Sequence, residues 1–479
     1  MPLAPTAQLL ASIEATAAGG RLRSIARAVA DAGGTAFLVG GAVRDGLWGD
    51  SVKDLDVEVF GLEFDRLHSV LGRFGDVIEI GHSFGVLAIR GLGIDFSLPR
   101  RDNKVAPGHK GFDIEFDPTL SFDRAARRRD LTINSMGIDL ATGELSDPYG
   151  GRIDLERRRL QATDALLFPE DPLRGLRVAQ FAARFCMAPT PELVALCAQL
   201  DLSELPAERI GEEFRKLLCK GREPSRGLSF LAEAELLRFF PELAALVGVP
   251  QDAEWHPEGD VWIHTLMAID RAAELRTGNA DKDELLMFGA LCHDLGKPAT
   301  TEKIDGRIRS RGHDKQAVEP TRALLARLAV GRALTDRVAA VVEHHLAPAL
   351  FTNLYTKQPT KNEACARGYR KLARRLGEVG VSMRDLELVA RSDHLGRTTP
   401  EAIRGEFPAG DAFLARAEQL AVRDQSAPDV VSGRHLIAAG FEPSPRFGEI
   451  LRRCREIQDA SGSTDASEIL ERALAGDAD

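Results

Sequence analysis

A glycine pair between an apolar segment and an amphipathic segment is the feature that most constrains this chain. Residues 35–39 (Thr-Ala-Phe-Leu-Val) form a short apolar run that predicts a strand, and Gly40 and Gly41 follow it directly. Residues 42–48 have helical spacing, and residues 55–60 alternate around acids as a second strand does. This order predicts a small α/β unit. The backbone amides of its glycine turn, at the start of a helix, would bind an anion.

Three acidic residues predict a metal site beside that turn. Asp54 and Asp56 are separated by one residue, and i and i+2 lie on the same face of a strand. Two neighbouring carboxylates repel unless a cation lies between them, and hard oxygen ligands favour Mg²⁺. Asp95 lies on a later predicted strand, residues 93–98, where it would complete a two-metal site. Two acids spaced in this way are also common on a solvated strand edge. The prediction therefore rests on the order of the features along the chain: strand, glycine pair, helix and acids.

Taken together, these sequence segments resemble the head domain of the class II tRNA nucleotidyltransferases, the CCA-adding enzymes. The resemblance rests first on Leu38-Val39-Gly40-Gly41-Ala42-Val43-Arg44-Asp45, followed by Asp54-Leu55-Asp56. Four later segments match the ribose-binding motif, the segment after it, the nucleotide-template motif and a later helix motif, at residues 128–134, 147–151, 170–177 and 208–212. The matches keep the family's order over residues 37 to 220.

The resemblance implies a role for each matching residue. Asp54 and Asp56 would hold Mg²⁺, with Asp95 as base or third ligand. The residues implied to bind the nucleotide are Gly40, Gly41, Arg44, Arg129, Asp130, Asn134, Asp171, Arg174 and Arg177. Among them, Asp130 would take the ribose 2′-hydroxyl. Gln180 departs from the pattern, because bacterial relatives usually carry an arginine one turn beyond Arg177.

Hydrogen-bond chemistry supports the template assignment independently. Cytosine and adenine present an amino donor beside a ring-nitrogen acceptor, whereas uracil and guanine present the reverse. A carboxylate only accepts and a guanidinium only donates. Asp171 and Arg174 lie three residues apart, so a helix would place them on one face. Together they would bind the edge of C or A and exclude U or G, whose donors and acceptors are reversed. The alternative is an ordinary surface ion pair between these two residues.

The C-terminal half has its own chemistry. His293-Asp294 follows an apolar run, and an adjacent histidine and aspartate can face one metal ion together. The order His264, His293-Asp294, Asp393 resembles the HD phosphohydrolase superfamily, and residues 255–266 resemble the HD domain appended to bacterial CCA-adding enzymes. The predicted ligands are His264, His293, Asp294 and Asp393, and further candidates are His313, His344 and His345. Imidazole ligands favour Ni²⁺, Mn²⁺ or Co²⁺ over Mg²⁺.

Charge and cysteine content limit the partners and the compartment. The net charge is −10, so an RNA partner would need local basic surfaces, and residues 124–129 and 357–376 are candidates. Each is also consistent with a solvated helix face. The six cysteines include no CxxC pair, which favours a reducing cytoplasm. Residues 1–20 do not read as a signal peptide, and we find no apolar run long enough to span a membrane.

The predicted fold class is α+β: a small mixed-sheet, polymerase-beta-like nucleotidyltransferase head, a mostly helical neck and body, and a helical HD domain. A chain of 479 residues has room for several domains. We predict an N-terminal helical extension, the head, a neck with the template and RNA-binding motifs, the HD domain and a C-terminal helical region, at residues 1–34, 35–160, 161–250, 251–400 and 401–479.

The resemblance implies an enzyme that adds C and A, as the 3′-terminal CCA, to tRNA from CTP and ATP without a nucleic-acid template. The HD domain would hydrolyse 2′,3′-cyclic phosphates or simpler phosphate esters. A poly(A) polymerase, a CC- or A-adding specialist, a nucleotide hydrolase with an inert head and an RNA-binding protein with an inactive transferase fold are the alternatives. Residues 101–117 have the length of the flexible loop that supports the switch from C to A. No membrane or protein partner is predicted.

Overall fold

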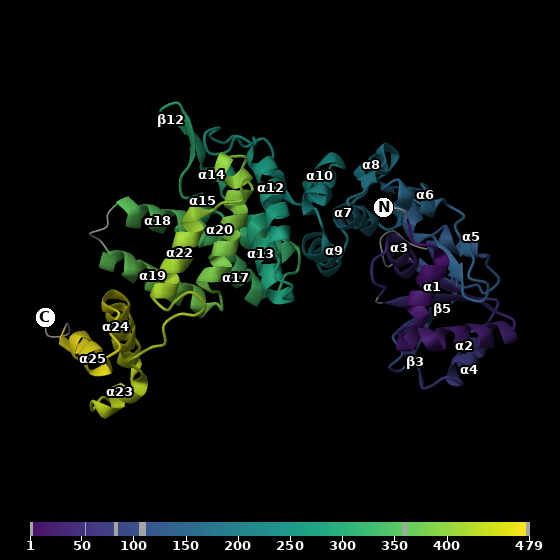
Figure 1. The fold of residues 1–479 in the computed structure, drawn as a ribbon, viewed down its shortest axis with the longest axis horizontal. Coiled ribbons are helices and arrows are strands. Elements are labelled where there is room, and N and C mark those ends of the chain that lie inside the picture. The colour runs from purple at the N-terminus through teal and green to yellow at the C-terminus, as the bar shows by residue number, and fades with distance from the viewer. Residues whose placement is uncertain (1–2, 53, 81–84, 105–111, 358–361, 476–479) are drawn as a thin grey trace. The chain divides into compact units, whose positions relative to one another are not determined.

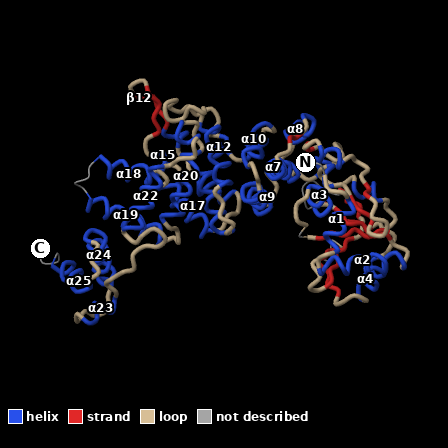
Figure 2. Tube along the Cα trace, in the orientation of Figure 1, coloured by secondary structure: helices blue, strands red, loops and turns tan. Residues whose placement is uncertain are grey.

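The computed structural model describes residues 3–52, 54–80, 85–104, 112–357 and 362–475. The chain divides into two compact units. The first comprises residues 1–213 and 226–239, and the second comprises residues 214–225 and 240–479. Figure 2 shows that the strands are concentrated in the N-terminal part of the chain, whereas the rest is mainly helical.

A seven-stranded mixed sheet forms the centre of the first unit, with the strand order β3-β4-β5-β2-β1-β8-β9. Within it β2 and β5 run parallel, and the other neighbouring strands run antiparallel. The strands are β1 (Thr35–Val39), β2 (Leu55–Phe60), β3 (Val77–Ile80), β4 (Val86–Ile89), β5 (Ile94–Ser97), β8 (Gly137–Asp139) and β9 (Leu145–Ser146). The mixed-sheet head predicted from sequence is confirmed.

Burial along β2 fits its place inside this sheet, because every residue of the strand except Asp56 is buried. Leu55, Val57 and Val59 point to one face and are buried, as a period of two requires. The helices of the head are α1 (Thr6–Glu14), α2 (Ala17–Asp31), α3 (Gly41–Trp48), α4 (Phe64–Gly72) and α5 (Phe122–Ala126). Helix α3 begins at the glycine pair, and Gly40 before it has a φ of +67°, a conformation that favours glycine.

The segment predicted as a flexible loop, residues 101–117, is largely a hairpin. Strand β6 (Arg100–Lys104) pairs antiparallel with β7 (Phe112–Phe116). The prediction missed these strands because it considered only the length of the segment. Residues 105–111, between the two strands, lie outside the described residues.

Further helices lie in the last part of the head and after it. They are η1 (Thr132–Asn134), α6 (Gly151–Glu156), η2 (Phe168–Glu170), α7 (Leu173–Phe185), α8 (Pro191–Ala198), α9 (Ala207–Lys220), α10 (Pro224–Glu233), η3 (Leu236–Phe239) and α11 (Pro241–Ala244). Strands β10 (Arg159–Leu160) and β11 (Ala188–Pro189) pair in parallel beside them. Helix α7 is strongly amphipathic, and its buried side includes Leu176, Phe181 and Phe185.

The second unit is built from packed helices, with one hairpin (Figure 1). Its helices are α12 (Val261–Glu274), α13 (Ala280–Cys292), α14 (Lys297–Thr300), α15 (His313–Gln316), α16 (Val318–Arg327), α17 (Arg332–His344), α18 (Ala347–Lys357), α19 (Asn362–Glu378), α20 (Met383–Leu395), α21 (Pro400–Ile403) and α22 (Pro408–Gln419). The hairpin pairs β12 (Thr301–Ile304) with β13 (Arg307–Ser310). Helices α12, α13, α17 and α20 pack on one another. Gly396 permits the close approach of α12, since a Cβ there would lie 2.7 Å from the Ala268 backbone.

Some of the basic side chains in residues 357–376 pair with groups of the protein itself. Arg374 on α19 pairs with Asp459 and Asp429, and Arg370 donates to the carbonyl oxygen of Asp459. These contacts fix α24 (Pro445–Ser461) against α19, and α23 (Gly433–Ala438) and α25 (Ala466–Ala475) pack on α24. Residues 358–361 of the stretch lie outside the described part. The interpretation as a wholly solvated or RNA-facing helix is therefore wrong for Arg370 and Arg374.

Among the described residues, no helix combines the length and the apolar character needed to cross a membrane.

Candidate active sites

The head places two of the predicted metal-binding carboxylates side by side. Asp56 on β2 lies opposite Asp95 on β5 in the parallel pairing. Both residues are exposed to solvent. Partial desolvation raises the pKa of Asp56, and the negative charges of Asp95 and Asp54 raise it further, while Arg129 lowers it. The carboxylates therefore repel one another, and a bound cation would relieve that repulsion.

Asp54 differs in position from the prediction. It is the residue directly before β2 and is exposed, so it does not share a regular strand with Asp56. Its charge nevertheless acts on Asp56.

A second acid on strand β2 was not recognised in the sequence. Glu58 lies two residues beyond Asp56, and its side chain is fully buried. One carboxylate oxygen accepts from Arg128 at 3.2 Å, and the other accepts from Arg129 at 3.0 Å. Gly40 leaves room for this arrangement, since a Cβ there would lie 3.1 Å from Nη1 of Arg129. Glu58 thus holds Arg129 between the glycine turn and the metal carboxylates.

A buried hydrogen-bond network joins the predicted nucleotide-binding residues. Arg44 donates to Asn134, and the amide of Asn134 donates to Asp130 at 2.8 Å. The guanidinium of Arg177 donates to the other oxygen of Asp130 at 2.6 Å. Burial alone would raise the pKa of Asp130, but Arg177 and the hydrogen bonds lower it to about 2. The structure therefore brings together four of the predicted residues from three separate segments.

Arg44 also stacks on helix α7. Its guanidinium lies 4.8 Å from the ring of Phe181 and 4.9 Å from the ring of Phe185, a cation–π arrangement. Gln180, on the same helix, is buried. The predicted phosphate donor Arg44 is therefore enclosed on its helix-facing side.

The two predicted template residues do not pair with each other. Asp171 precedes α7, because Pro172 is the N-cap of that helix, and so the expected helical i, i+3 pair does not form. Asp171 accepts from Arg209 at 3.2 Å. Arg174 donates to the carbonyl oxygens of Leu167 and Arg128, each at 2.7 Å. These contacts exclude the simple surface ion pair. Arg209, within the later helix motif, is a site residue that the sequence analysis did not single out.

The second unit gathers the four predicted HD residues in its core. Nε2 of His264 lies 3.0 Å from Asp393 and 3.3 Å from Nε2 of His293. Nε2 of His293 lies 3.2 Å from Oδ2 of Asp294. All four side chains are buried and come from α12, the end of α13 and α20.

Two of the further candidates extend this cluster. Nε2 of His313 lies 3.3 Å from Nε2 of His345 and 3.5 Å from Oδ1 of Asp294. Oδ2 of Asp294 thus faces the pair His264–His293, and Oδ1 faces the pair His313–His345. Burial, together with the neighbouring imidazoles, lowers the pKa of His345 to about 3, so this ring is neutral at pH 7. Within the described residues, His344 does not join His264, His293 and Asp393, nor Asp294, His313 and His345, as a potential metal ligand.

The geometry of the rings fits a metal site. The Nδ1 atoms of His293, His313 and His345 lie 2.7–2.8 Å from backbone carbonyl oxygens, which accept hydrogen bonds but cannot donate them. Each Nδ1 therefore carries a proton, and each Nε2 points into the cluster, where the neutral ring presents a lone pair to a metal ion. Lone pairs that face one another repel, and a bound cation would relieve that repulsion. The ring nitrogens and carboxylates form two groups of potential metal ligands, His264–His293–Asp393 and Asp294–His313–His345.

Two cations border the same carboxylates. Nζ of Lys297 lies 2.7 Å from Asp294, and Arg397 donates to Asp393 at 3.1 Å. Burial opposes ionisation of both aspartates, but His293 and then Lys297 lower the pKa of Asp294, and Arg397 and then His264 lower the pKa of Asp393, each well below its usual range. The carboxylates are therefore ionised, as metal ligands must be.

Three family models match separate parts of the chain. The poly A polymerase head domain matches residues 36–161, the probable RNA and SrmB-binding site of polymerase A matches residues 190–246, and the HD domain matches residues 261–377. These matches and the two sites define a polymerase-type nucleotidyltransferase head joined to an HD domain.

Known relatives cover most of the chain. The multifunctional CCA protein of Pasteurella multocida (strain Pm70) is 35% identical over 426 residues, which cover 87% of this chain and 94% of the relative. Bacillus stearothermophilus CCA-adding enzyme in complex with CTP has the same fold, with a TM-score of 0.64, 20% identity and coverage of 96% of this chain and 98% of that chain. Thermotoga maritima CCA-adding enzyme complexed with tRNA gives a TM-score of 0.59 at 19% identity, with 99% of both chains covered.

The chain belongs to the multifunctional CCA protein family, which is the family of CCA-adding tRNA nucleotidyltransferases that carry an HD domain. The predicted family and fold class are confirmed.

Changing Glu58 to Gln tests whether this buried carboxylate supports the head. The change leaves Arg128 and Arg129 without their anion, and since both arginines remain partly exposed we expect a loss of about 1–3 kcal/mol. Burial opposes ionisation of Glu58, but the arginines lower its pKa below the ordinary value. Its contribution is therefore complete at pH 7 and is lost as the pH falls through the lowered pKa.

The measurement is the urea midpoint of wild type and Glu58→Gln between pH 7 and pH 4. Glu63→Gln, which changes an exposed carboxylate before α4, is the control. An equal loss in both variants, or a difference that grows as the pH falls, would contradict the assignment.

Proposed function

We propose that the head adds C and A nucleotides to the 3′ end of tRNA from CTP and ATP without a nucleic-acid template. The tRNA 3′-hydroxyl attacks the α-phosphorus of the nucleotide, a new phosphodiester bond forms, and pyrophosphate leaves with the electron pair of the broken P–O bond. The pairing of Asp56 with Asp95, beside the arginine held by Glu58, is the observation that carries this proposal.

The carboxylates supply the metal site in this proposal. Asp54 and Asp56 would hold Mg²⁺, whose oxygen preference suits them, and Asp95 would serve as third ligand or base. When bound, Mg²⁺ neutralises triphosphate charge and favours the ionised form of the attacking hydroxyl. The position of Asp56 supports this role, because partial desolvation and then the negative charge of Asp95 raise its pKa, and a bound cation would offset both effects.

The remaining residues position the nucleotide. Gly40 and Gly41 present backbone amides at the start of α3, where a phosphate is favoured, and Arg129 lies beside them. Asp130 would accept from the ribose 2′-hydroxyl, and Asn134 and Arg177 hold it ionised and in place. Arg44 would act on the phosphates and, through Asn134, on the position of Asp130.

Asp171 and Arg174 would read the base edge. Arg209 fixes the first, and two backbone carbonyl oxygens fix the second. A fixed acceptor and a fixed donor select an amino group beside a ring nitrogen, which only C and A present. Preorganised groups lose little entropy when the base binds, so they discriminate efficiently.

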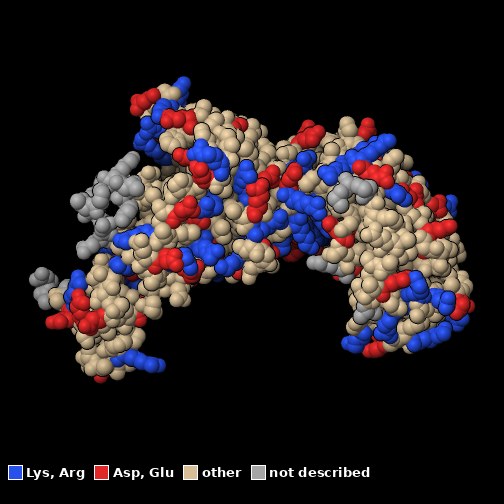
Figure 3. Space-filling model, in the orientation of Figure 1, with Lys and Arg blue, Asp and Glu red and all other residues tan. Residues whose placement is uncertain are grey.

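Local basic surface would bind the tRNA. Figure 3 shows Lys and Arg side chains gathered over α9, whose basic residues are Arg209, Arg215, Lys216 and Lys220. Phosphate contacts of this kind bind nucleic acid even when the whole protein is acidic. A cytoplasmic location is part of the proposal and is consistent with six free cysteines.

A second activity is favoured by the imidazole cluster. The HD domain would hydrolyse a 2′,3′-cyclic phosphate, with water adding to phosphorus as one P–O bond breaks, and so clear a blocked 3′ end. His264, His293, Asp294 and Asp393 would hold one transition-metal ion, and His313 and His345 with Asp294 a second. Ni²⁺, Mn²⁺ or Co²⁺ suits these ligands, and the bound ion supplies a hydroxide near neutral pH. The alternative is an inactive HD domain that serves only as a scaffold.

The change Asp56→Ala should abolish nucleotide addition and leave the fold intact. Losing one metal ligand removes several kcal/mol of transition-state stabilisation, about 10³-fold or more in rate. The measurement is incorporation of labelled CTP and ATP into tRNA with Mg²⁺. Asp76→Asn, which changes an exposed aspartate of the same unit, is the control. Near wild-type incorporation by Asp56→Ala would overturn the assignment.

Asp171→Ala or Arg174→Ala should relax the choice of nucleotide. A hydrogen bond to a base edge contributes about 1–3 kcal/mol of discrimination, which corresponds to about 5- to 150-fold. The measurement is misincorporation of UTP and GTP relative to CTP and ATP. Arg209→Ala should cause a smaller loss, because it only releases Asp171. Active variants with unchanged selectivity would show that these residues do not act as the template.

Replacing His293 or His345 by Ala should abolish metal-dependent hydrolysis of a 2′,3′-cyclic nucleotide, measured with added Ni²⁺. His344→Ala is the matched control, because His344 is adjacent to His345 in sequence but lies outside both ligand groups of the described residues. The scaffold interpretation predicts no wild-type activity with any of the three metals. Activity that survives His293→Ala would place the site elsewhere.

A further inference from the structure

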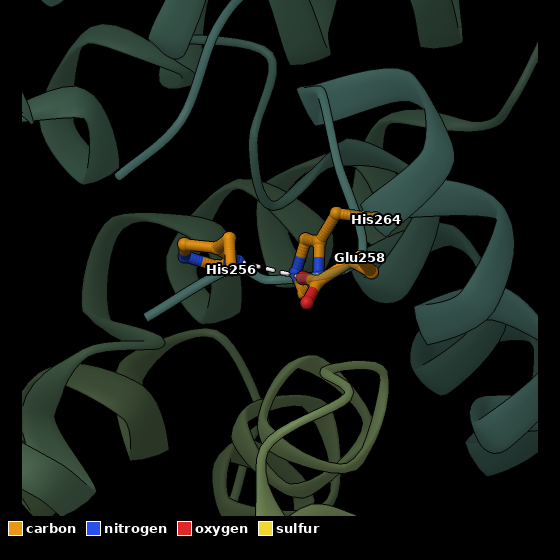
Figure 4. A group of neighbouring side chains, drawn as sticks. All are labelled: His256, Glu258 and His264. Carbon is orange, nitrogen blue, oxygen red and sulfur yellow. Dashed lines mark hydrogen bonds and ion pairs between the residues drawn. The ribbon is translucent and has the colours of Figure 1, made fainter. Parts of the chain in front are cut away.

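One carboxylate next to the HD cluster is not accounted for by the ligand set. Glu258 lies in the segment before α12, and its side chain is 1% exposed. Its Oε1 lies 2.8 Å from Nδ1 of His264 and 2.8 Å from Nδ1 of His256, as Figure 4 shows. Its Oε2 accepts from the backbone N–H of Thr398 at 3.2 Å.

The partners of Glu258 determine which nitrogen of His264 carries the proton. Both ring nitrogens of His264 face a carboxylate, Glu258 at Nδ1 and Asp393 at Nε2. Asp393 also accepts from the guanidinium of Arg397, whereas the hydrogen-bond partners of Glu258 are the two imidazoles and the backbone N–H of Thr398. The proton of His264 therefore belongs at Nδ1.

His264 differs in this respect from the other three histidines of the cluster. His293, His313 and His345 each donate Nδ1–H to the backbone carbonyl oxygen three residues earlier. These acceptors are neutral; Ala290 and Val342 lie in α13 and α17, and Ser310 ends β13. A carboxylate acceptor raises the basicity of the imidazole more than a carbonyl does, so His264 is the stronger donor ligand of the four.

We infer that Glu258 is a positioning residue of the HD site, which fixes the Nδ1–H tautomer of His264 and so commits its Nε2 to metal binding. This inference rests on the proposed metal-dependent function. Glu258 also links two ligand-bearing segments, because Thr398 follows Arg397, the partner of Asp393. Removing its charge should weaken the ion at His264–His293–Asp393 and leave the ion at Asp294–His313–His345 unchanged.

The test is a Co²⁺ titration of the full chain by calorimetry and visible absorption. Asp54 and Asp56 are changed to Asn in every sample, so that the head does not contribute ions. Glu258→Gln should lower one of the two affinities by about 10- to 100-fold and leave the other unchanged. Glu254→Gln, a mostly exposed carboxylate of the same segment, should change neither affinity.

Each other outcome overturns a defined part of the account. Unchanged affinities in Glu258→Gln would overturn the positioning role while the metal site stands. A loss of both affinities together with a lower melting temperature of the metal-free protein would show a structural role only. A parent protein that binds no Co²⁺ would overturn the proposed HD function itself.

A second variant covers the case in which Glu258→Gln does not fold. His256→Phe keeps a ring of similar size but removes one donor to Glu258. We expect it to weaken the same ion by less than Glu258→Gln would. Weakening of the other ion instead, or no effect, would contradict the inference.

Discussion

The parallel pairing of β2 with β5 is the constraint on which the head depends. That register sets Asp56 opposite Asp95, in a sheet whose other neighbouring strands run antiparallel. The same strand carries Glu58 two residues further on, where the buried carboxylate holds the partly exposed Arg128 and Arg129. Strand β2 thus places the exposed Asp56 beside Asp95 and fixes two arginines through Glu58. A shift of one residue would send both acids to the opposite face.

The HD cluster relies on a different constraint, the direction of ring protons. Backbone carbonyl oxygens hold the Nδ1 protons of three histidines, so their lone pairs converge around Asp294. Lys297 and Arg397 keep the aspartates ionised in a buried setting. The protein therefore builds two anionic centres of different character, an oxygen-rich one in the head and a nitrogen-rich one in the HD domain. Their ligand chemistry suits different metals.

Local patterns allowed part of this to be predicted from sequence. The strand, glycine pair and helix at residues 35–48 lie close together in the chain, and the structure has them as predicted. The pairing of Asp56 with Asp95 depends on a crossover between distant segments, which periodicity does not reveal. Asp171 was placed on a helix, although Pro172 favours a helix start at that point. Glu58 was missed despite a signal, since it continues the alternation of acids along β2. His313 and His345 could be chosen over His344 only once the fold brought them to Asp294.

The central claim is that the head adds a defined sequence of nucleotides and then stops. The most direct measurement offers Mg²⁺ and single nucleotides to tRNA that ends before CCA, at CC, or with complete CCA. The account predicts CTP incorporation only on the first tRNA, ATP incorporation only on the second, and none on the third. Repeated ATP addition to complete tRNA would instead show a poly(A) polymerase. The absence of any incorporation would show an RNA-binding protein with an inactive transferase fold.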